Sequence, residues 1–133
     1  MLTATSEKKT NCYAWTTGRE EGPFFCKLCG RESIIKKGKI IAHHFAHKAK
    51  AKDCTFGVGE SDIHHRAKRE IFEDLCSHSD CVDCDVELPI NNVIPDVYAV
   101  IRGAKVAIEV QKSKMTVDEA YRRTVELSKN GCM

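Results

Sequence analysis

Apolar and polar residues alternate through the segment from Ile94 to Ser113, and this period of two predicts a β-hairpin. β-Branched and aromatic residues fill both halves of the segment, and the dipeptide Arg102-Gly103 interrupts them at the predicted turn. With the turn at this position, Asp96 lies directly opposite Glu109, with their Cβ atoms about 5 Å apart. The pattern therefore places two acidic side chains side by side on one face of the hairpin.

These two facing carboxylates are the first feature that needs a chemical explanation. Like charges directly opposite each other destabilise a sheet, so the pair requires a cation or a shared proton. A shift of one residue in the strand register removes the pairing and leaves two solvated acids on an exposed face. The spacing alone leaves both interpretations open.

Two helices are predicted around this hairpin. Apolar residues recur at helical spacing in the segment 61–75, and Ser61 is suited to cap the amino end of that helix. A second helix is predicted within residues 115–131, because Thr116 opens a capping-box pattern. Gly131 is suited to end it, since glycine readily adopts the left-handed backbone of a helix C-terminus.

A further strand is predicted for residues 85–90, so the elements follow the order helix, three strands, helix. This α-β-β-β-α order predicts an α/β sandwich, a mixed α+β fold with the antiparallel hairpin at its centre. Gly57 and Gly59 break any regular element ahead of the first helix. We therefore expect a small N-terminal module over residues 1–56 and a larger α/β core over residues 57–133.

The composition narrows the class of protein. The chain has 133 residues and a net charge of +2, and no apolar run is long enough to span a membrane. Its start lacks the apolar core of a signal peptide, so the eight cysteines are expected in a reducing, cytoplasmic environment that favours metal ligation over disulfides.

The charge is distributed unevenly. Residues 31–52 hold seven Lys or Arg against one Glu, and residues 70–87 hold seven acids and no Lys or Arg. Such blocks suit a phosphate-binding surface or ordinary solvated segments, and charge alone does not decide between them.

The segment FFCKLCG has the Cys-x2-Cys spacing of a zinc knuckle, with a glycine after the second cysteine. A hairpin is predicted next, at residues 33–42, followed by a cluster of histidines and a further cysteine. Three thiolates and one imidazole form a tetrahedral set that suits structural zinc and leaves no open position for a substrate. The alternative is a set of buried cysteines and surface histidines without a metal. The predicted ligands are Cys26, Cys29, His47 and Cys54, with His44 as a competing ligand.

A second group of cysteines lies in the segment CSHSDCVDC, at residues 76–84, with a less regular spacing. Two interpretations are open: a second zinc site that also recruits Cys12, or free thiols in a loop. The residues concerned are Cys76, His78, Cys81 and Cys84.

Several short motifs follow one another along residues 25–124. They are FFCKLCG, HHFAH, ESDIHHRAK, IPDVY, AIEVQKS and RRT. In this combination the chain resembles the competence protein CoiA-like family, which is placed in the PD-(D/E)xK nuclease superfamily. The resemblance implies a restriction-endonuclease-like core, preceded by the zinc-binding module, and an activity on DNA.

The resemblance also implies a catalytic site. Asp96 and Glu109 are expected to hold Mg²⁺ or Mn²⁺, with Glu60 as a third carboxylate. Glu60, His64 and Lys68 are spaced by four and form a stripe on a helix, which without the resemblance would be an ordinary solvated face. Gln111 is expected to position the attacking water, while His64 or Lys68 contacts the phosphate or the leaving oxygen. The implied catalytic set is Glu60, His64, Lys68, Asp96, Glu109 and Gln111.

Two features depart from the superfamily pattern. The usual lysine is Gln111 here, as in the CoiA-like pattern itself, and an amide can orient water but brings no positive charge. The chain also ends at Met133, soon after the second predicted helix, where such folds usually add a strand. A truncated chain, a minimal variant, or a sheet completed by a protein partner or a second copy would each account for this.

These observations predict a Mg²⁺- or Mn²⁺-dependent DNA nuclease with DNA as its partner. The alternative is a nuclease-fold module that binds DNA or a protein without cutting.

Overall fold

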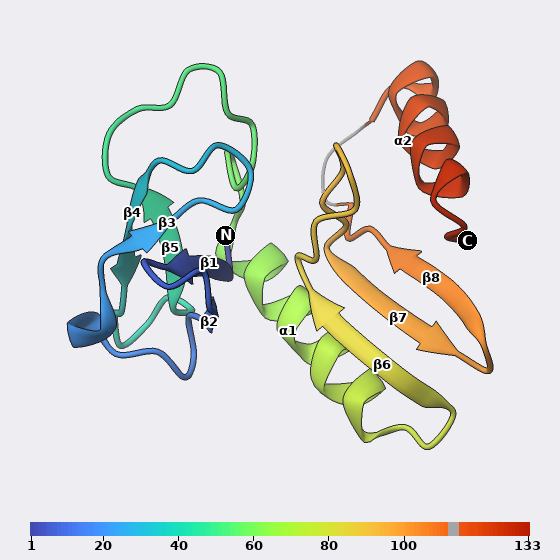
Figure 1. Ribbon diagram of the computed structural model, residues 1–133, viewed down its shortest axis with the longest axis horizontal. Helices are drawn as coiled ribbons and strands as arrows, with labels where there is room; N and C mark the ends of the chain where they lie inside the picture. The colour runs from blue at the N-terminus through green and yellow to red at the C-terminus, as the bar shows by residue number, and fades with distance from the viewer. Residues whose placement is uncertain (112–114) are drawn as a thin grey trace. The chain divides into compact units, whose positions relative to one another are not determined.

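The computed structural model describes residues 1–111 and 115–133 and divides the chain into two compact units, Met1–His65 and Arg66–Met133 (Figure 1). The division falls within helix α1 (Asp62–Ser77). Residues 112 and 113, the end of the motif AIEVQKS, lie outside the described residues. Neither α1 nor any other helix in the described part of the chain is both long and apolar enough to cross a bilayer.

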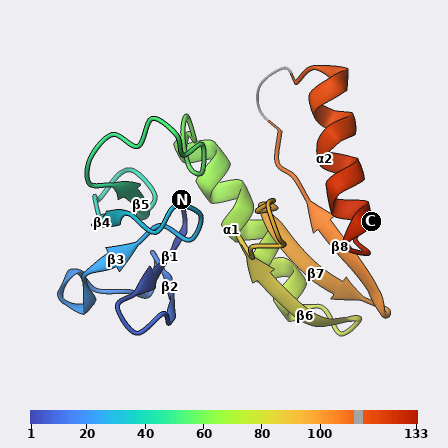
Figure 2. The same ribbon diagram turned by 45° about the horizontal axis from the view of Figure 1, so that its top comes forward.

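The first unit is a five-stranded antiparallel sheet in the order β2-β1-β3-β4-β5 (Figures 1 and 2). Its core forms where Phe45 packs edge-on against Phe24, with ring centroids 5.1 Å apart. The strands at the amino end were not predicted from the sequence. The elements are β1 (Thr3–Ser6), β2 (Asn11–Tyr13), the short 3-10 helix η1 (Arg19–Glu21), β3 (Phe24–Phe25), β4 (Glu32–Lys36) and β5 (His44–His47).

The hairpin predicted at residues 33–42 is wrong in its second strand. Strand β4 pairs instead with His44–His47, in a register that sets Ile35 opposite Phe45. The physical reason is burial, because Phe45 is only 1% exposed whereas Ile40 is 86% exposed. The later strand inserts an aromatic ring into the core, and the intervening residues form an exposed loop.

The second unit holds a three-stranded antiparallel sheet in the order β6-β7-β8 and ends with helix α2 (Figure 1). The order from α1 to α2 is helix, three strands, helix, and the fold is mixed α/β, as predicted. The elements are β6 (Cys81–Val86), β7 (Val97–Ile101), β8 (Ala104–Ile108) and α2 (Val117–Lys129).

The β7–β8 hairpin has the predicted turn. Ile101 pairs with Ala104, and the ladder runs back to Val97 opposite Ile108. Arg102 and the glycine after it both have positive φ, at 49° and 79°, as a tight two-residue turn requires.

Strand β6 lies earlier than predicted. It spans Cys81–Val86 rather than residues 85–90, so the later part of the cysteine segment, for which a loop was one of two interpretations, is a strand. Glu87 follows with φ of 53°, a left-handed conformation that an extended ladder cannot continue through. The strand therefore ends where the prediction placed its middle.

The helix caps agree with the sequence. The hydroxyl of Ser61 accepts a hydrogen bond from the backbone N–H of His64 at 3.2 Å. The hydroxyl of Thr116 accepts one from the N–H of Glu119, also at 3.2 Å. Gly131 has φ of 76°, the left-handed geometry expected at the C-terminal end of α2.

Candidate metal centres

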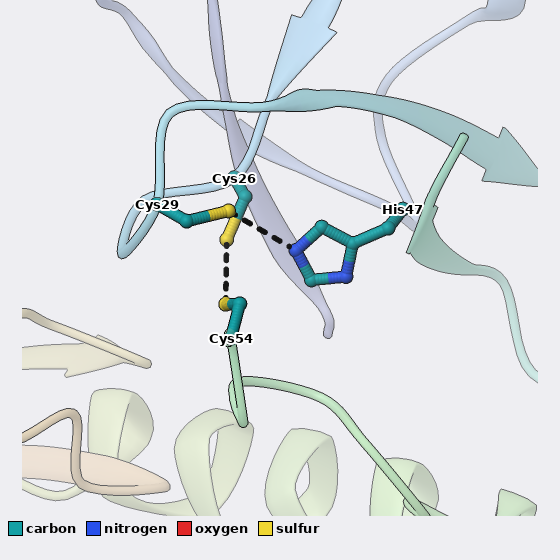
Figure 3. A group of neighbouring side chains, drawn as sticks. All are labelled: Cys26, Cys29, His47 and Cys54. Carbon is teal, nitrogen blue, oxygen red and sulfur yellow. Dashed lines mark hydrogen bonds between the residues drawn. The ribbon is translucent and has the colours of Figure 1, made fainter. Parts of the chain in front are cut away.

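Four predicted zinc ligands meet in the first unit (Figure 3). Two thiols come from the turn between β3 and β4, the imidazole from the last residue of β5, and the third thiol from the segment beyond it. Their ligand atoms all lie within 4.8 Å of one another. The ligands are Cys26, Cys29, His47 and Cys54.

The distances in this cluster suit a tetrahedral ion. The sulfur atoms of Cys26 and Cys54 are 3.9 Å apart, and the sulfur of Cys29 is 3.3 Å from Nε2 of His47. Bond lengths to zinc imply separations of about 3.8 Å between two sulfurs and about 3.6 Å between sulfur and nitrogen. The four residues therefore fit a zinc ion with little movement.

A tight turn presents the first two thiols. The N–H of Gly30 donates to the carbonyl of Cys26 at 2.9 Å, and Gly30 has φ of 71°. The backbone N–H of Cys26 also donates to the carbonyl of Arg31 at 2.9 Å, closing the loop from the other side. Glycine after the second cysteine is thus required by the backbone, as the sequence indicated.

The thiol pKa values in the cluster are shifted by burial and by the neighbouring thiols. Burial, and then the side-chain hydrogen bond with Cys29 and the charge of Cys54, raises the pKa of Cys26 to about 12. Burial also acts against ionisation of Cys29, but hydrogen bonds from the Arg31 backbone and the neighbouring thiols lower its pKa overall. A bound metal ion would supply the positive charge that favours the thiolate form of a buried cysteine such as Cys26.

The competing ligand His44 is held elsewhere. Its Nδ1 lies 2.9 Å from the carbonyl of Ala42, and its ring stacks on that of His65 with centroids 4.9 Å apart. It is not a member of the four-residue cluster.

A second candidate centre lies at the open end of the β7–β8 hairpin. The ladder ends at Val97 opposite Ile108, so Asp96 and Glu109 occupy the next position along the two strands. Oδ2 of Asp96 accepts a hydrogen bond from the N–H of Val110 at 2.7 Å, which continues the link between the strands.

Each of the two acids has a cationic neighbour. Nη2 of Arg123, on α2, lies 2.5 Å from Oε1 of Glu109. Nζ of Lys68, on α1, lies 3.6 Å from Oδ1 of Asp96. The repulsion expected between two facing carboxylates is therefore opposed by cations that the protein itself supplies.

Glu87 is the third acid at this centre, and no sequence pattern predicted its role. Its Oε1 accepts a hydrogen bond from Nζ of Lys68 at 2.6 Å, and the two side chains are 1% and 0% exposed. Its backbone N–H donates to the carbonyl of Asp96 at 3.0 Å. Within a strand-like pattern Glu87 looks like an ordinary acid, and its burial beside Lys68 is what indicates a role in this centre.

Three carboxylates face two cations here, which leaves one net negative charge. Burial raises the pKa of Glu109, Arg123 opposes that rise, and the charge of Asp96 adds to it. The site is thus partly buried and short of positive charge.

The other predicted residues lie as follows. Gln111 is exposed and comes two residues after Glu109. Glu60 precedes α1 instead of lying on it, so the predicted helical stripe of three residues is wrong at its first member. Within the first unit, the Glu60 carboxylate lies 3.0 Å from Nε2 of His65 and 3.8 Å from Nδ1 of His64.

The second cysteine group is less tightly assembled. Burial, and then the thiols of Cys76 and Cys81, raises the pKa of Cys84. These three are not among the described residues whose ligand atoms all lie within 4.8 Å of one another. Cys12 is buried in the core of the first unit.

Comparisons with known proteins agree over both units. The family model described as competence protein CoiA, N-terminal domain, matches residues 7–57, and that described as competence protein CoiA, nuclease-like domain, matches residues 60–133. The competence protein CoiA of Bacillus subtilis (strain 168) is 32% identical over 109 residues, or 81% of this chain. The chain spans 29% of the length of that protein. No solved structure matches the chain.

We predict about one tightly bound zinc per chain. Cys29→Ser should lose the metal and lower the melting temperature by about 10 °C or more, because binding energy of this kind is folding energy. Cys76→Ser, an exposed cysteine outside the cluster, is the matched control and should keep both metal and stability. Metal analysis and melting curves measure the two effects. Zinc-free protein with an unchanged melting temperature would contradict the prediction.

The buried pair of Lys68 and Glu87 should be costly to break. Glu87→Gln or Lys68→Met alone should reduce the free energy of unfolding by about 3–5 kcal/mol, because each leaves a buried charge without its partner. The double variant should lose less than the sum. Arg69→Met, which breaks an exposed pair with Glu73 on the same helix, should cost under about 1 kcal/mol. Equal costs for Arg69→Met and Lys68→Met in urea titrations would count against the assignment.

Proposed function

Because this chain belongs to the competence protein CoiA family, we propose that it is a divalent-metal-dependent nuclease that hydrolyses phosphodiester bonds in DNA. The observation that carries the proposal is the meeting of Asp96, Glu109 and Glu87 around two cations, with one net negative charge. The match to a nuclease-like domain supports it. We also propose that the Cys3His cluster of the first unit binds zinc in a structural role.

Asp96 and Glu109 are the proposed ligands of Mg²⁺ or Mn²⁺, since hard cations prefer carboxylate oxygens. Arg123 holds Oε1 of Glu109, and Oε2 of the same carboxylate is the oxygen we assign to the ion. A divalent ion there would lower the pKa of a water molecule and offset charge on the scissile phosphate.

Lys68 is proposed to position Asp96. Its side chain is 0% exposed and bound to Glu87, so a direct contact with the phosphate of DNA is not the role we assign to it. It lies 3.6 Å from Oδ1 of Asp96 and limits how that carboxylate can turn. Lys68 thus supplies a positive charge beside Asp96, in a site where Gln111 replaces the usual lysine.

Arg123 is the proposed phosphate contact. Its Nε is buried and has no hydrogen-bond partner among the described residues, while its Nη2 is bound to Glu109. The Arg123 side chain as a whole is 33% exposed, unlike that of Lys68, so the outer part of its guanidinium can donate a charge-assisted bond to a phosphate oxygen.

Three further residues complete the proposed set. Gln111 is exposed and carries an amide suited to orient the attacking water. Glu60 and His64 are assigned to the site on the family resemblance, as a third carboxylate and a phosphate or leaving-group contact.

A second function is favoured by two observations. Gln111 supplies no positive charge, and Arg123 already neutralises Glu109 where a metal would otherwise do so. A nuclease-fold module that holds DNA or a protein without cutting would keep both features.

Cleavage of plasmid DNA in Mn²⁺ tests the nuclease proposal. Wild type should cut, and Asp96→Asn and Glu109→Gln should each lose about 100-fold or more of the rate while still binding DNA, because they remove ligand charge without changing shape. Glu70→Gln, an exposed acid on α1, is the matched control and should cut normally. DNA binding by all variants with no cleavage by any would identify the binding module instead.

Melting curves test the metal site independently of activity. The raised pKa of Glu109 means that the folded protein holds this proton more tightly, so that contribution to stability is present at low pH and is lost as pH rises through the folded pKa. In EDTA, wild type should therefore lose more stability than Glu109→Gln between pH 4 and pH 7. At pH 7, Mn²⁺ should raise the melting temperature of wild type and leave that of Glu109→Gln nearly unchanged. An equal response of both to Mn²⁺ would rule out Glu109 as a ligand.

A further inference from the structure

The segment between two of the zinc ligands is a lysine-rich loop. His47 ends β5 and Cys54 closes the cluster, and the six residues 48–53 between them read KAKAKD. We call residues 48–53 the basic loop. Both of its ends are fixed at the same four-ligand site, so its conformation is tied to that site.

Burial distinguishes Ala51 from the lysines of the basic loop. Ala51 is partly buried and packs against the core of the first unit. The three lysines of the loop are exposed to solvent: Lys48, Lys50 and Lys52. The loop is therefore anchored through a small apolar side chain and presents positive charge to the outside.

Two hollows on the surface adjoin the basic loop. One of about 590 Å³ is shared with Arg31 and Glu32, and one of about 520 Å³ is shared with Thr55 and Val58. Lys48, Lys50 and Lys52 line both. The positive charge thus borders concave surface on which an anionic chain can lie.

Part of this charge is neutralised within the unit and part is not. Arg31 makes a two-pronged ion pair with Asp53, at 2.5 and 2.9 Å, and Lys48 pairs with Glu32 at 2.9 Å. Lys50 and Lys52 have no acidic partner among the described residues. The two ion pairs hold the flanks of the loop, and two lysines stay available for a ligand.

We propose that the basic loop binds the phosphate backbone of DNA, and that the metal at the Cys3His cluster holds it in the binding conformation. The inference rests on the proposed function, because it takes DNA as the ligand. Neither hollow is lined by Phe, Tyr or Trp, and the one imidazole, that of His47, belongs to the Cys3His cluster. The contact that we assign to the lysines is therefore to phosphate and independent of base sequence.

The dependence on metal follows from chain entropy. With both ends fixed, Lys50 and Lys52 are already held together at one surface, whereas a released loop must be ordered by the DNA itself. Loss of the metal should therefore weaken binding although every lysine is still present.

The test is binding of full-length protein to a fluorescent 20-base-pair duplex, without Mg²⁺ or Mn²⁺ so that no cutting occurs. The double variant Lys50→Gln with Lys52→Gln should raise the Kd about tenfold at 50 mM salt. It should also lower the slope of log K against log salt by about two, since each phosphate contact contributes about 0.9. Lys8→Gln with Lys9→Gln, exposed lysines between β1 and β2, removes the same charge and should change Kd less than threefold.

Equal effects of the two double variants would overturn the inference, because the net charge alone would then explain binding. Cys29→Ser should weaken DNA binding as the loop variant does. Unchanged binding by that zinc-free variant would contradict the proposal that the metal holds the basic loop in its binding conformation. The two proposals fail separately. Normal cleavage and unaffected binding by the loop variant would contradict only the loop proposal, whereas wild type that cuts no DNA in Mn²⁺ would contradict the nuclease proposal.

Discussion

The buried ion pair between Lys68 and Glu87 is the interaction on which the candidate site of the second unit depends. Desolvating two charges is expensive, and the cost is offset only when the geometry is good and the remaining donors and acceptors are used. Here the pair is 2.6 Å long, Lys68 also approaches Asp96, and the backbone of Glu87 donates to the Asp96 carbonyl. These three contacts link α1, the residue after β6 and the residue before β7 around Asp96.

The first unit also buries ionisable side chains, but it groups thiols and an imidazole in place of an internal ion pair. Its sheet is built from strands of two to five residues around a small core, and three thiols are gathered beside one imidazole. Burial raises the pKa of Cys26, and Arg31, whose charge lowers the pKa of Cys29, is itself paired with Asp53. In the second unit internal cations offset most of the charge of the buried acids, whereas in the first unit the proposed zinc ion would supply the positive charge.

Local chemistry accounts for what the sequence could and could not predict. The β7–β8 register followed from alternation and a two-residue turn, and the caps at Ser61 and Thr116 followed from side chains that act within one helical turn. The strand at β5 was misplaced because Ile40 and Ile41 have high β-propensity, whereas in the structure both side chains are exposed and lie outside the core. Glu87 was missed because its role depends on a lysine 19 residues away, and no local pattern records such a pairing.

The charge balance of the acid centre bears on what it can bind. Asp96, Glu109 and Glu87 against Lys68 and Arg123 leave a charge of about −1, which repels a DNA phosphate when no ion is present. One divalent cation changes this to about +1, and a single phosphodiester then brings the total close to zero. A monovalent ion reaches only neutrality and gives the phosphate no attraction. The proposed dependence on a divalent ion follows from this balance, because a net charge of about −1 attracts a metal ion and repels DNA until that ion is bound.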